Sequence, residues 1–423
     1  MPAPHLEDKT VANTILTNSM ITREALTMFV NANPFMRRIR RDYSDEFARS
    51  GAKIGQTINI RGRVDYTVGS GATVTPQNTN ESEIPLTVSS QKNIAMTFGS
   101  SELALNIDDF RERYLKTAIN NLAAIVASDV MSMVDGGTGA GPASHLVHNV
   151  DGSNNTISPT MGTFLNAGAK LVDNGYPDTD RLAILSPTTN ARVVSSMSTL
   201  FNPVSDVSGQ TRSGLMGSNI LGIAEFMQDV TVINHKTGSF TAGTVNGAGQ
   251  TGNTLTVSAI TGTLNTGDII SIAGVNAVNR LTKLSSGAPR QFTVTAPVAS
   301  GATSIPIYPA ITPYDTVNSV NVQFQTVDVS PATGAVISLA TVANETYRAN
   351  LVFAPEAFQL ATVDLPLMGG GVVDEARESY QGISMRTISY YTGNSDQRVT
   401  RIDILYGRAL VRPEWVVRVA DAL

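Results

Sequence analysis

The sequence predicts an α+β protein in which a small antiparallel β-domain is inserted into a larger domain of helices and strands. From residue 236 to 344 only seven of 109 residues are charged, and the chain has no methionine between Met227 and Met368. Short alternating runs rich in Gly, Thr, Val and Ser recur there between turn residues, as in a barrel or a sandwich. On both sides of this stretch, helical and extended patterns alternate.

The composition of the 423 residues excludes several classes of function. There is no cysteine, so disulfide scaffolds, thiolate nucleophiles, Fe–S clusters and cysteine-based zinc sites are ruled out. The net charge of −5 predicts no general attraction to nucleic acid. Only 15% of residues are charged, and arginine outnumbers lysine by 23 to 7. Codon bias explains an excess of arginine equally well, but together with the low charge this excess favours extensive protein–protein contact.

No targeting or membrane segment is expected. The first ten residues, MPAPHLEDKT, lack a basic stretch followed by an apolar core, so we expect no secretory signal. The most apolar segment, 117–134, contains Asn120, Asn121 and Asp129, which would be costly in hydrocarbon. We therefore expect no membrane partner, and we expect the chain to be synthesised as a soluble protein in a cytoplasm.

The N-terminal segment reads as a helix over residues 11–33 that ends at Asn33-Pro34. Its apolar side chains fall on one face and could contact another subunit or pack on their own subunit: Ile21, Ala25, Met28, Phe29 and Ala32. A basic cluster follows: Arg37, Arg38, Arg40 and Arg41. Four arginines can meet only a few phosphates. Ion pairs with Asp42, Asp45 or Glu46, or with acidic groups of a partner, are at least as consistent with the pattern.

In the next segment, apolar and polar residues alternate as in β-strands, and a helical pattern follows. Residues 57–61 and 86–89 alternate around a glycine-bearing tip at 68–73, which predicts a two-stranded excursion. A helix of about 40 Å is expected over 107–134, capped by Asn106 and ended by Gly136-Gly137. It would be a strut or a core helix, with one apolar side: Phe110, Tyr114, Ala118, Leu122, Ile125 and Val126.

The remaining elements are shorter. We expect helices after Ser158 and after Ser186-Pro187, and a short helix at 355–361. Strands are expected outside the β-rich stretch at 182–185, 230–233, 350–353, 384–391 and 400–406. Inside it they are expected at 255–257, 268–272, 291–294, 305–307, 320–324 and 336–339. Gly267 and Gly274 bracket the run that begins at Asp268, so we expect all three residues to be structural.

No constellation for catalysis is found. His145 and His148 form the only histidine pair, without nearby carboxylates, and a metal needs three or four ligands. The glycine-rich run 136–141 lacks the Gly-Lys-Ser/Thr ending of a phosphate loop. No Gly-x-Ser-x-Gly elbow exists. The sequence therefore predicts no catalytic residue, metal or cofactor.

Four stretches resemble the tailed-bacteriophage major capsid proteins of the Hong Kong 97 type, and among them the P22-group coat proteins that carry an inserted β-barrel. The stretches are NPFMRR at 33–38, GDIISIAGV at 267–275, NLVFAPEAF at 350–358, and RIDILYG at 401–407 with Arg412-Pro413-Glu414. Residues 136–157 have no counterpart in this resemblance.

The resemblance implies the following organisation: an N-terminal arm (1–50), an extended β-loop (51–98), the spine helix of a peripheral domain (99–137), an axial domain (138–235), an inserted β-barrel (236–344), and the rest of the axial domain with the C-terminal strands of the peripheral domain (345–423). It implies that the extended loop reaches a neighbouring subunit, with these contact candidates: Arg61, Arg63, Asp65, Glu81 and Glu83.

The resemblance also implies the partners. Pentamers and hexamers of the chain would form the shell of a virion, assembled in the host cytoplasm around a scaffolding protein and a portal. Decoration proteins could bind outside, and double-stranded DNA would be enclosed with weak, non-specific contact. Two rivals remain at this stage: the shell of a bacterial nanocompartment, and a β-rich surface-binding protein.

Overall fold

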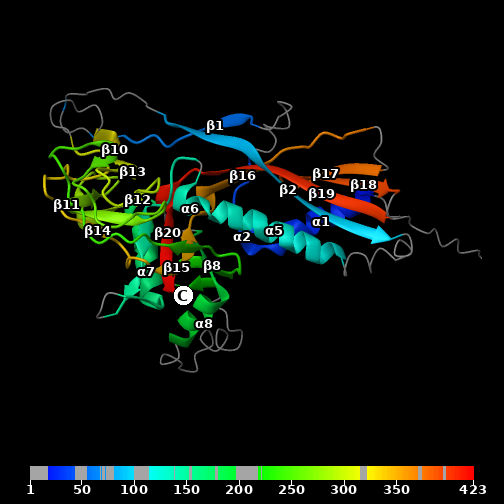
Figure 1. Cartoon of the computed structure of the whole chain (residues 1–423), viewed down its shortest axis with the longest axis horizontal. Helices are drawn as coiled ribbons and strands as arrows, with labels where there is room; N and C mark the ends of the chain where they lie inside the picture. Colours follow the sequence, from blue (N-terminus) through cyan, green and yellow to red (C-terminus); the bar gives the residue numbers. More distant parts are fainter. Residues whose placement is uncertain are drawn as a thin grey trace, which may run out of the picture.

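The computed structural model describes residues 18–42, 55–66, 68, 72, 81–99, 114–137, 139–151, 155–176, 180–196, 218–220, 222–314, 322–369, 374–393 and 397–423. These residues form sheets of six, seven and five strands and a small two-stranded sheet. Figure 1 shows an elongated molecule, with the five-stranded sheet at one end of the long axis and the hairpin of β17 (Asp374–Tyr380) and β18 (Ile383–Thr392) at the other. The chain is a mixed α+β protein dominated by strands.

The six-stranded sheet is antiparallel and joins segments that are far apart in the sequence. Its order is β1 (Thr57–Arg61), β2 (Glu83–Gly99), β19 (Gln397–Leu410), β18 and β17, and β16 (Phe358–Thr362) also pairs with β19. In the β1–β2 pair, Thr57 lies opposite Thr87 and Arg61 opposite Glu83. We call this six-stranded sheet the main sheet. Because β2 also pairs along most of β19, the β1–β2 excursion is an extension of the main sheet.

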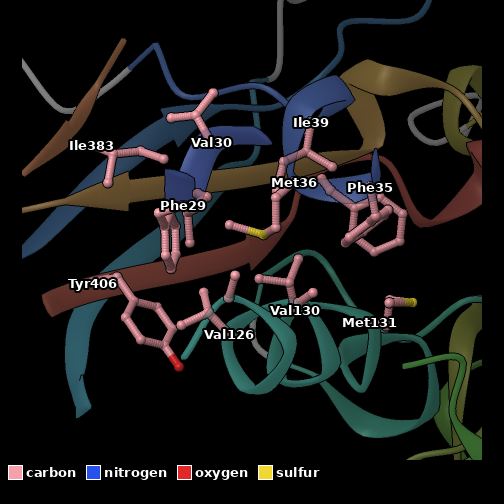
Figure 2. Close-up of a cluster of buried hydrophobic side chains, with 14 of the residues drawn as sticks. Phe29, Val30, Phe35, Met36, Ile39, Val126, Val130, Met131, Ile383 and Tyr406 are labelled. Carbon is pink, nitrogen blue, oxygen red and sulfur yellow. The ribbon is translucent and has the colours of Figure 1, made fainter. Parts of the chain in front are cut away.

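Helices pack on this sheet and form the main core with it. The apolar residues of α1 (Asn18–Ala32), α2 (Pro34–Arg38) and α5 (Lys116–Met131) meet those of β18 and β19 in one cluster. Figure 2 shows Phe29 of α1, Met36 of α2 and Val130 of α5 converging near Tyr406. Burial of such side chains is the main source of stability, so the arm helix belongs to the fold of its own subunit.

The buried face of α5 agrees with the predicted one at Ala118, Leu122 and Val126 but differs at Ile125. Ile125 is half exposed, whereas Ile119 and Ala123 are fully buried. Asn106 and Phe110 lie outside the described residues. With α6 (Met133–Gly136), the stretch Lys116–Gly136 is long and apolar enough for a membrane span. Its buried side packs on α1 and β2, which identifies it as a core helix.

The seven-stranded sheet mixes parallel and antiparallel pairs. Its order is β3 (His145–Val147), β20 (Val416–Ala422), β15 (Thr346–Phe353), β6 (Leu182–Leu185), β8 (Ile223–Gln228) and β7 (Ser218–Ile220), and β9 (Asn234–Lys236) also pairs with β15. β3 runs parallel to β20, and β6 parallel to β8. The helices α7 (Met161–Asp173) and α8 (Pro187–Ser196) share a core with this sheet. The small sheet pairs β4 (Asn149–Val150) with β5 (Thr156–Ile157).

The five-stranded sheet has a hydrophobic core of its own. Its antiparallel order is β10 (Gly252–Thr256), β13 (Ser304–Ile311), β12 (Ser285–Val294), β11 (Ile269–Val278) and β14 (Ile337–Leu339). All members of this core lie between Phe240 and Leu339, separate from the main core. Thr244 bridges to Val336 beside β14, and Val245 bridges to Val257 beside β10. We call residues 236–344 the β10–β14 module.

Three predicted elements are wrong. Residues 230–233 lie in a turn and a loop, and Val230 is 81% exposed, while the strand of this region is β8. Residues 355–361 are not a helix: a 3-10 turn at Pro355–Ala357 leads directly into β16, whose five residues are all buried. In place of a strand at 320–324, Val322–Phe324 forms a 3-10 turn, and residues 320 and 321 lie outside the described part.

Candidate partner surface and module junction

Three members of the arginine cluster line an open groove of about 800 Å³ between α2, β8 and the turn that precedes β16. The walls carry both signs of charge: Arg37, Arg38 and Arg40 on one side, and Asp180, Glu225 and Glu356 among the other lining residues. The Asn33 side chain starts α2 by accepting hydrogen bonds from the backbone N–H groups of Phe35 and Met36. This cap fixes the direction in which the arginines that follow leave the arm.

Within the groove, two arginines pair with acids of the same subunit. Arg38 forms an ion pair with Glu225. Arg40 lies 2.6 Å from Glu356 and 3.3 Å from Asp42. Burial disfavours the charge of Arg40, but hydrogen bonds to Asp42 and Glu356 outweigh it and raise its pKa. The predicted partner Asp42 is thus present, and Asp45 and Glu46 lie outside the described residues.

The other two arginines differ in exposure. Arg37 is exposed on the rim of the groove. Arg41 is half-buried, and burial lowers its pKa although Asp42 opposes the shift. Arg37 is therefore the member of the cluster with the freest access to another molecule.

The apolar stripe of the arm is mostly used inside the subunit. Ile21 is 6% exposed and Phe29 is fully buried in the main core. This corrects the expectation that they contact a neighbour, and agrees with the alternative that the stripe packs on its own subunit. Met28 is partly exposed at the edge of that core, and Ala32 is exposed at the end of α1.

The segment that follows β1 in the β1–β2 excursion is held by an ion network within the subunit. Asp65 lies 3.0 Å from Arg63 and 3.0 Å from Arg280 of the β10–β14 module, and Arg280 lies 2.8 Å from Glu414. Burial lowers the pKa of Arg63. For Arg280 burial acts in the same direction, but Glu414 and Asp65 outweigh it and raise the pKa. Arg63 and Asp65 are therefore committed to contacts within the chain.

The other loop candidates lie at the surface. Arg61 is largely exposed and lies 3.7 Å from Glu81. Glu83 accepts a hydrogen bond from Asn59 across the β1–β2 pair, at 2.6 Å. Exposed pairs of this kind contribute little to the stability of one subunit, so these three charged residues stay available to a neighbour.

The predicted structural residues of the β10–β14 module lie at its junction with the seven-stranded sheet. Asp268 is buried and accepts hydrogen bonds from His235 Nε2 at 2.9 Å and from the backbone N–H groups of Asn265 and Gly238 at 2.7 and 3.0 Å. Gly267 has φ +93°, and a Cβ atom there would lie 2.9 Å from the backbone oxygen of Asp135. Gly274 has φ +79° and faces open space.

A buried arginine completes this junction. Arg418 of β20 has no exposed surface and donates to Asp135 at 2.7 Å and to the carbonyl oxygens of Gly267 and Ala143 at 2.8 and 2.6 Å. Asp135 Oδ2 also lies 3.2 Å from His235 Nδ1. Sequence reasoning missed Asp135, His235 and Arg418. The one available signal was the lone arginine within the apolar run of β20.

His145 and His148, the histidine pair considered for metal binding, do not belong to a metal site within the described residues. Burial, with Arg290 and Lys170 nearby, lowers the pKa of His145 well below its usual value. Burial and Lys170 also lower the pKa of the half-buried His148. Within the described residues, no group of three or more His, Cys, Asp or Glu side chains could hold a metal ion.

Comparisons with known proteins point to one family. Residues 67–418 match the family described as "P22 coat protein - gene protein 5". Similar solved structures include one of Mycobacterium phage Che8 (12% identity, 92% of this chain and 90% of that chain, TM-score 0.43) and the capsid of cyanophage P-SCSP1u (13%, 88% and 84%, TM-score 0.43). A third, the CUS-3 coat protein I-domain, is 31% identical over 23% of this chain and 94% of that one, with a TM-score of 0.19. No curated protein sequence matches.

Proposed function

The chain belongs to the P22 coat protein family, and we propose on that premise that its subunits build a phage shell through a scaffold-assisted procapsid. Membership makes it a major capsid protein of the virion, structural and not enzymatic. The match over residues 67–418, most of the chain, is the observation that carries this assignment. Many copies of the chain form the shell; their arrangement as pentamers and hexamers, and assembly in the host cytoplasm, are part of the proposal.

The proposed architecture is the Hong Kong 97 type with an inserted barrel. The separate core of the β10–β14 module supports an insertion. So does the closeness of its two ends, where the Thr237 N–H donates to the Glu345 carbonyl at 2.8 Å and Lys236 lies opposite Thr346. The bridges of Thr244 and Val245 to both edges of the sheet favour closure into a barrel.

The groove beside α2 is the surface that we assign to assembly. Its exposed Arg37 suits an acidic side chain of a neighbouring subunit or of a scaffolding protein. The portal and decoration proteins are further expected partners. The enclosed double-stranded DNA would be touched weakly, because the chain is mildly acidic with a net charge of −5. Met28, Arg61, Glu81 and Glu83 are the remaining surface candidates for contact between subunits.

Electron microscopy of the chain coexpressed with its candidate scaffold tests the proposal. Closed shells should form with the scaffold inside, and failure to form shells under any condition would contradict it. Arg37→Gln should reduce the yield of closed shells and leave thermal unfolding of the subunit unchanged. Arg23→Gln is the matched control, because Arg23 is an exposed arginine on α1 outside the groove. Equal yields from both variants would remove the groove from the assembly contacts.

A further inference from the structure

Two acids and two bases meet where the β10–β14 module joins the seven-stranded sheet. His235 comes from β9, Asp268 from the residue before β11, Asp135 from α6 and Arg418 from β20. The side chains of Arg418 and Asp268 have no exposed surface, and His235 is 4% exposed. The Asp135 side chain is 23% exposed. These contacts join the module to the rest of the subunit in a place where three of the four side chains have little access to water, so that charge pairs there are strong and unpaired charges costly.

Each ring nitrogen of His235 faces a carboxylate. Nδ1 lies 3.2 Å from Asp135 Oδ2, and Nε2 lies 2.9 Å from Asp268 Oδ1. A neutral imidazole carries one N–H, so its other nitrogen would turn a lone pair toward a carboxylate oxygen. Only the imidazolium ion can donate to both acids. With both acids ionised, this geometry favours the protonated form of His235.

The charges that face His235 balance only when it is protonated. Asp135 and Asp268 supply two negative charges, and His235 and Arg418 supply two positive ones. The Tyr347 ring of β15 packs on the imidazole, with 5.3 Å between the ring centroids. Arg348, also on β15, forms an ion pair with Asp421 at 3.7 Å. The neighbours of His235 on β9, Asn234 and Lys236, are exposed. Loss of the proton leaves one uncompensated negative charge in a buried cluster, which is destabilising.

We propose that His235 is a proton-dependent clamp that holds the β10–β14 module to the rest of the subunit and releases it as the solution becomes alkaline. Burial opposes the charge on His235, but hydrogen bonds to Asp135 and Asp268 outweigh it and raise its pKa. The folded chain then binds this proton more tightly than the unfolded chain does. The stabilisation is fully present below the ordinary histidine value of about 6.5 and is lost as the pH rises through the pKa of the folded state.

Thermal unfolding of the full chain as a function of pH tests the clamp. Between pH 5.5 and 8.5, the unfolding midpoint of the wild type should fall by roughly 2 °C or more relative to that of His235→Gln, whose amide cannot titrate. His148→Gln is the control, since it removes a histidine outside the cluster. Burial lowers the pKa of Lys170 to about 8, and this residue titrates in all three proteins. Its effect on the unfolding midpoint therefore cancels in the comparison. Parallel curves for the wild type and His235→Gln would overturn the clamp.

A second measurement needs no variant at position 235. The chain has four histidines, and the ring signals of His5, His145 and His148 can be assigned in histidine-labelled protein by replacing each with glutamine. The remaining signal should titrate above pH 6.5, and amide exchange in β9 should accelerate through the same range. Titration of His235 below pH 6.5 would contradict the proposal even if His235→Gln failed to fold.

Discussion

Gly267 and Gly274 lie before and within β11 and differ in what a side chain would meet. Both have positive φ, which L side chains rarely adopt. At Gly267 a Cβ atom would also lie 2.8 Å from Asp135 Cβ and 2.9 Å from the His235 ring, whereas Gly274 has open space. We expect Gly267→Val to lower the free energy of unfolding by about 3 kcal/mol or more, from strain and overpacking together. Denaturant unfolding of the full chain measures it.

Gly274→Val is the matched control for this prediction. It carries the backbone strain without the clash, so it should cost only about 1–2 kcal/mol. The same loss of stability at both sites would mean that the contacts with Asp135 and His235 are not what restricts position 267.

The sequence predicted part of the junction at the residue scale. Gly267 and Asp268 were singled out because Gly267 and Gly274 bracket the predicted strand that begins at Asp268. Their partners could not be inferred, since Asp135 and Arg418 are separated from Asp268 by more than a hundred residues in opposite directions. Charge pairing between such segments depends on tertiary contacts that no local pattern encodes.

At the element scale, the arm helix α1 should contribute to the stability of the subunit. Phe29 is fully buried against α5 and β19, so Phe29→Ala should cost about 3–5 kcal/mol. Met28→Ala should cost less than about 1 kcal/mol, because Met28 is only partly buried. Chemical unfolding of both variants checks the difference. Two variants as stable as the wild type would show that α1 detaches from the core in solution.

The elements that sequence reasoning got wrong have different causes. Burial on both faces removes the alternation that marks a strand, and every residue of β16 is buried, so its apolar run was taken for a helix. The apolar run at 230–233 was taken for a strand, yet Val230 lies exposed in a turn. By contrast, the predictions at 182–185 and after Ser186-Pro187 are confirmed by β6 and α8, where the Thr189 N–H donates to Ser186 Oγ.

The β10–β14 module should fold without the rest of the chain. Its core contains large buried side chains such as Phe292, and its ends meet at Thr237 and Glu345. A polypeptide of residues 232–346 should give a β-type circular dichroism spectrum and a cooperative thermal transition. Phe292→Ala in the same polypeptide should lower its stability by about 3–5 kcal/mol. A featureless spectrum from the unmodified polypeptide would show that the boundaries or the independence of the module are wrong.

On the scale of the whole molecule, the main sheet and the seven-stranded sheet both combine early and late parts of the sequence. β2 pairs with β19, and β3 pairs with β20, so strands that precede residue 150 pair with strands near the C-terminus in both sheets. The β10–β14 module lies between these paired segments in the sequence and contacts the rest of the chain through the His235 cluster and the Asp65–Arg280–Glu414 network.

The mature shell should be held together without covalent bonds between subunits. Some capsid proteins of the Hong Kong 97 type join a lysine on the extended loop covalently to an asparagine of the next subunit. In this chain, residues 64–83 of the loop contain no lysine, and there is no cysteine to form a disulfide. Among the lysines the structure describes, Lys92 lies 3.2 Å from Asp129 and Lys170 is held by Gln291 and the Leu146 carbonyl. The shell must therefore rely on buried contact area between subunits. Purified particles boiled in detergent should run as a single band near 44.7 kDa, and a ladder of multimers would show cross-links that this sequence does not predict.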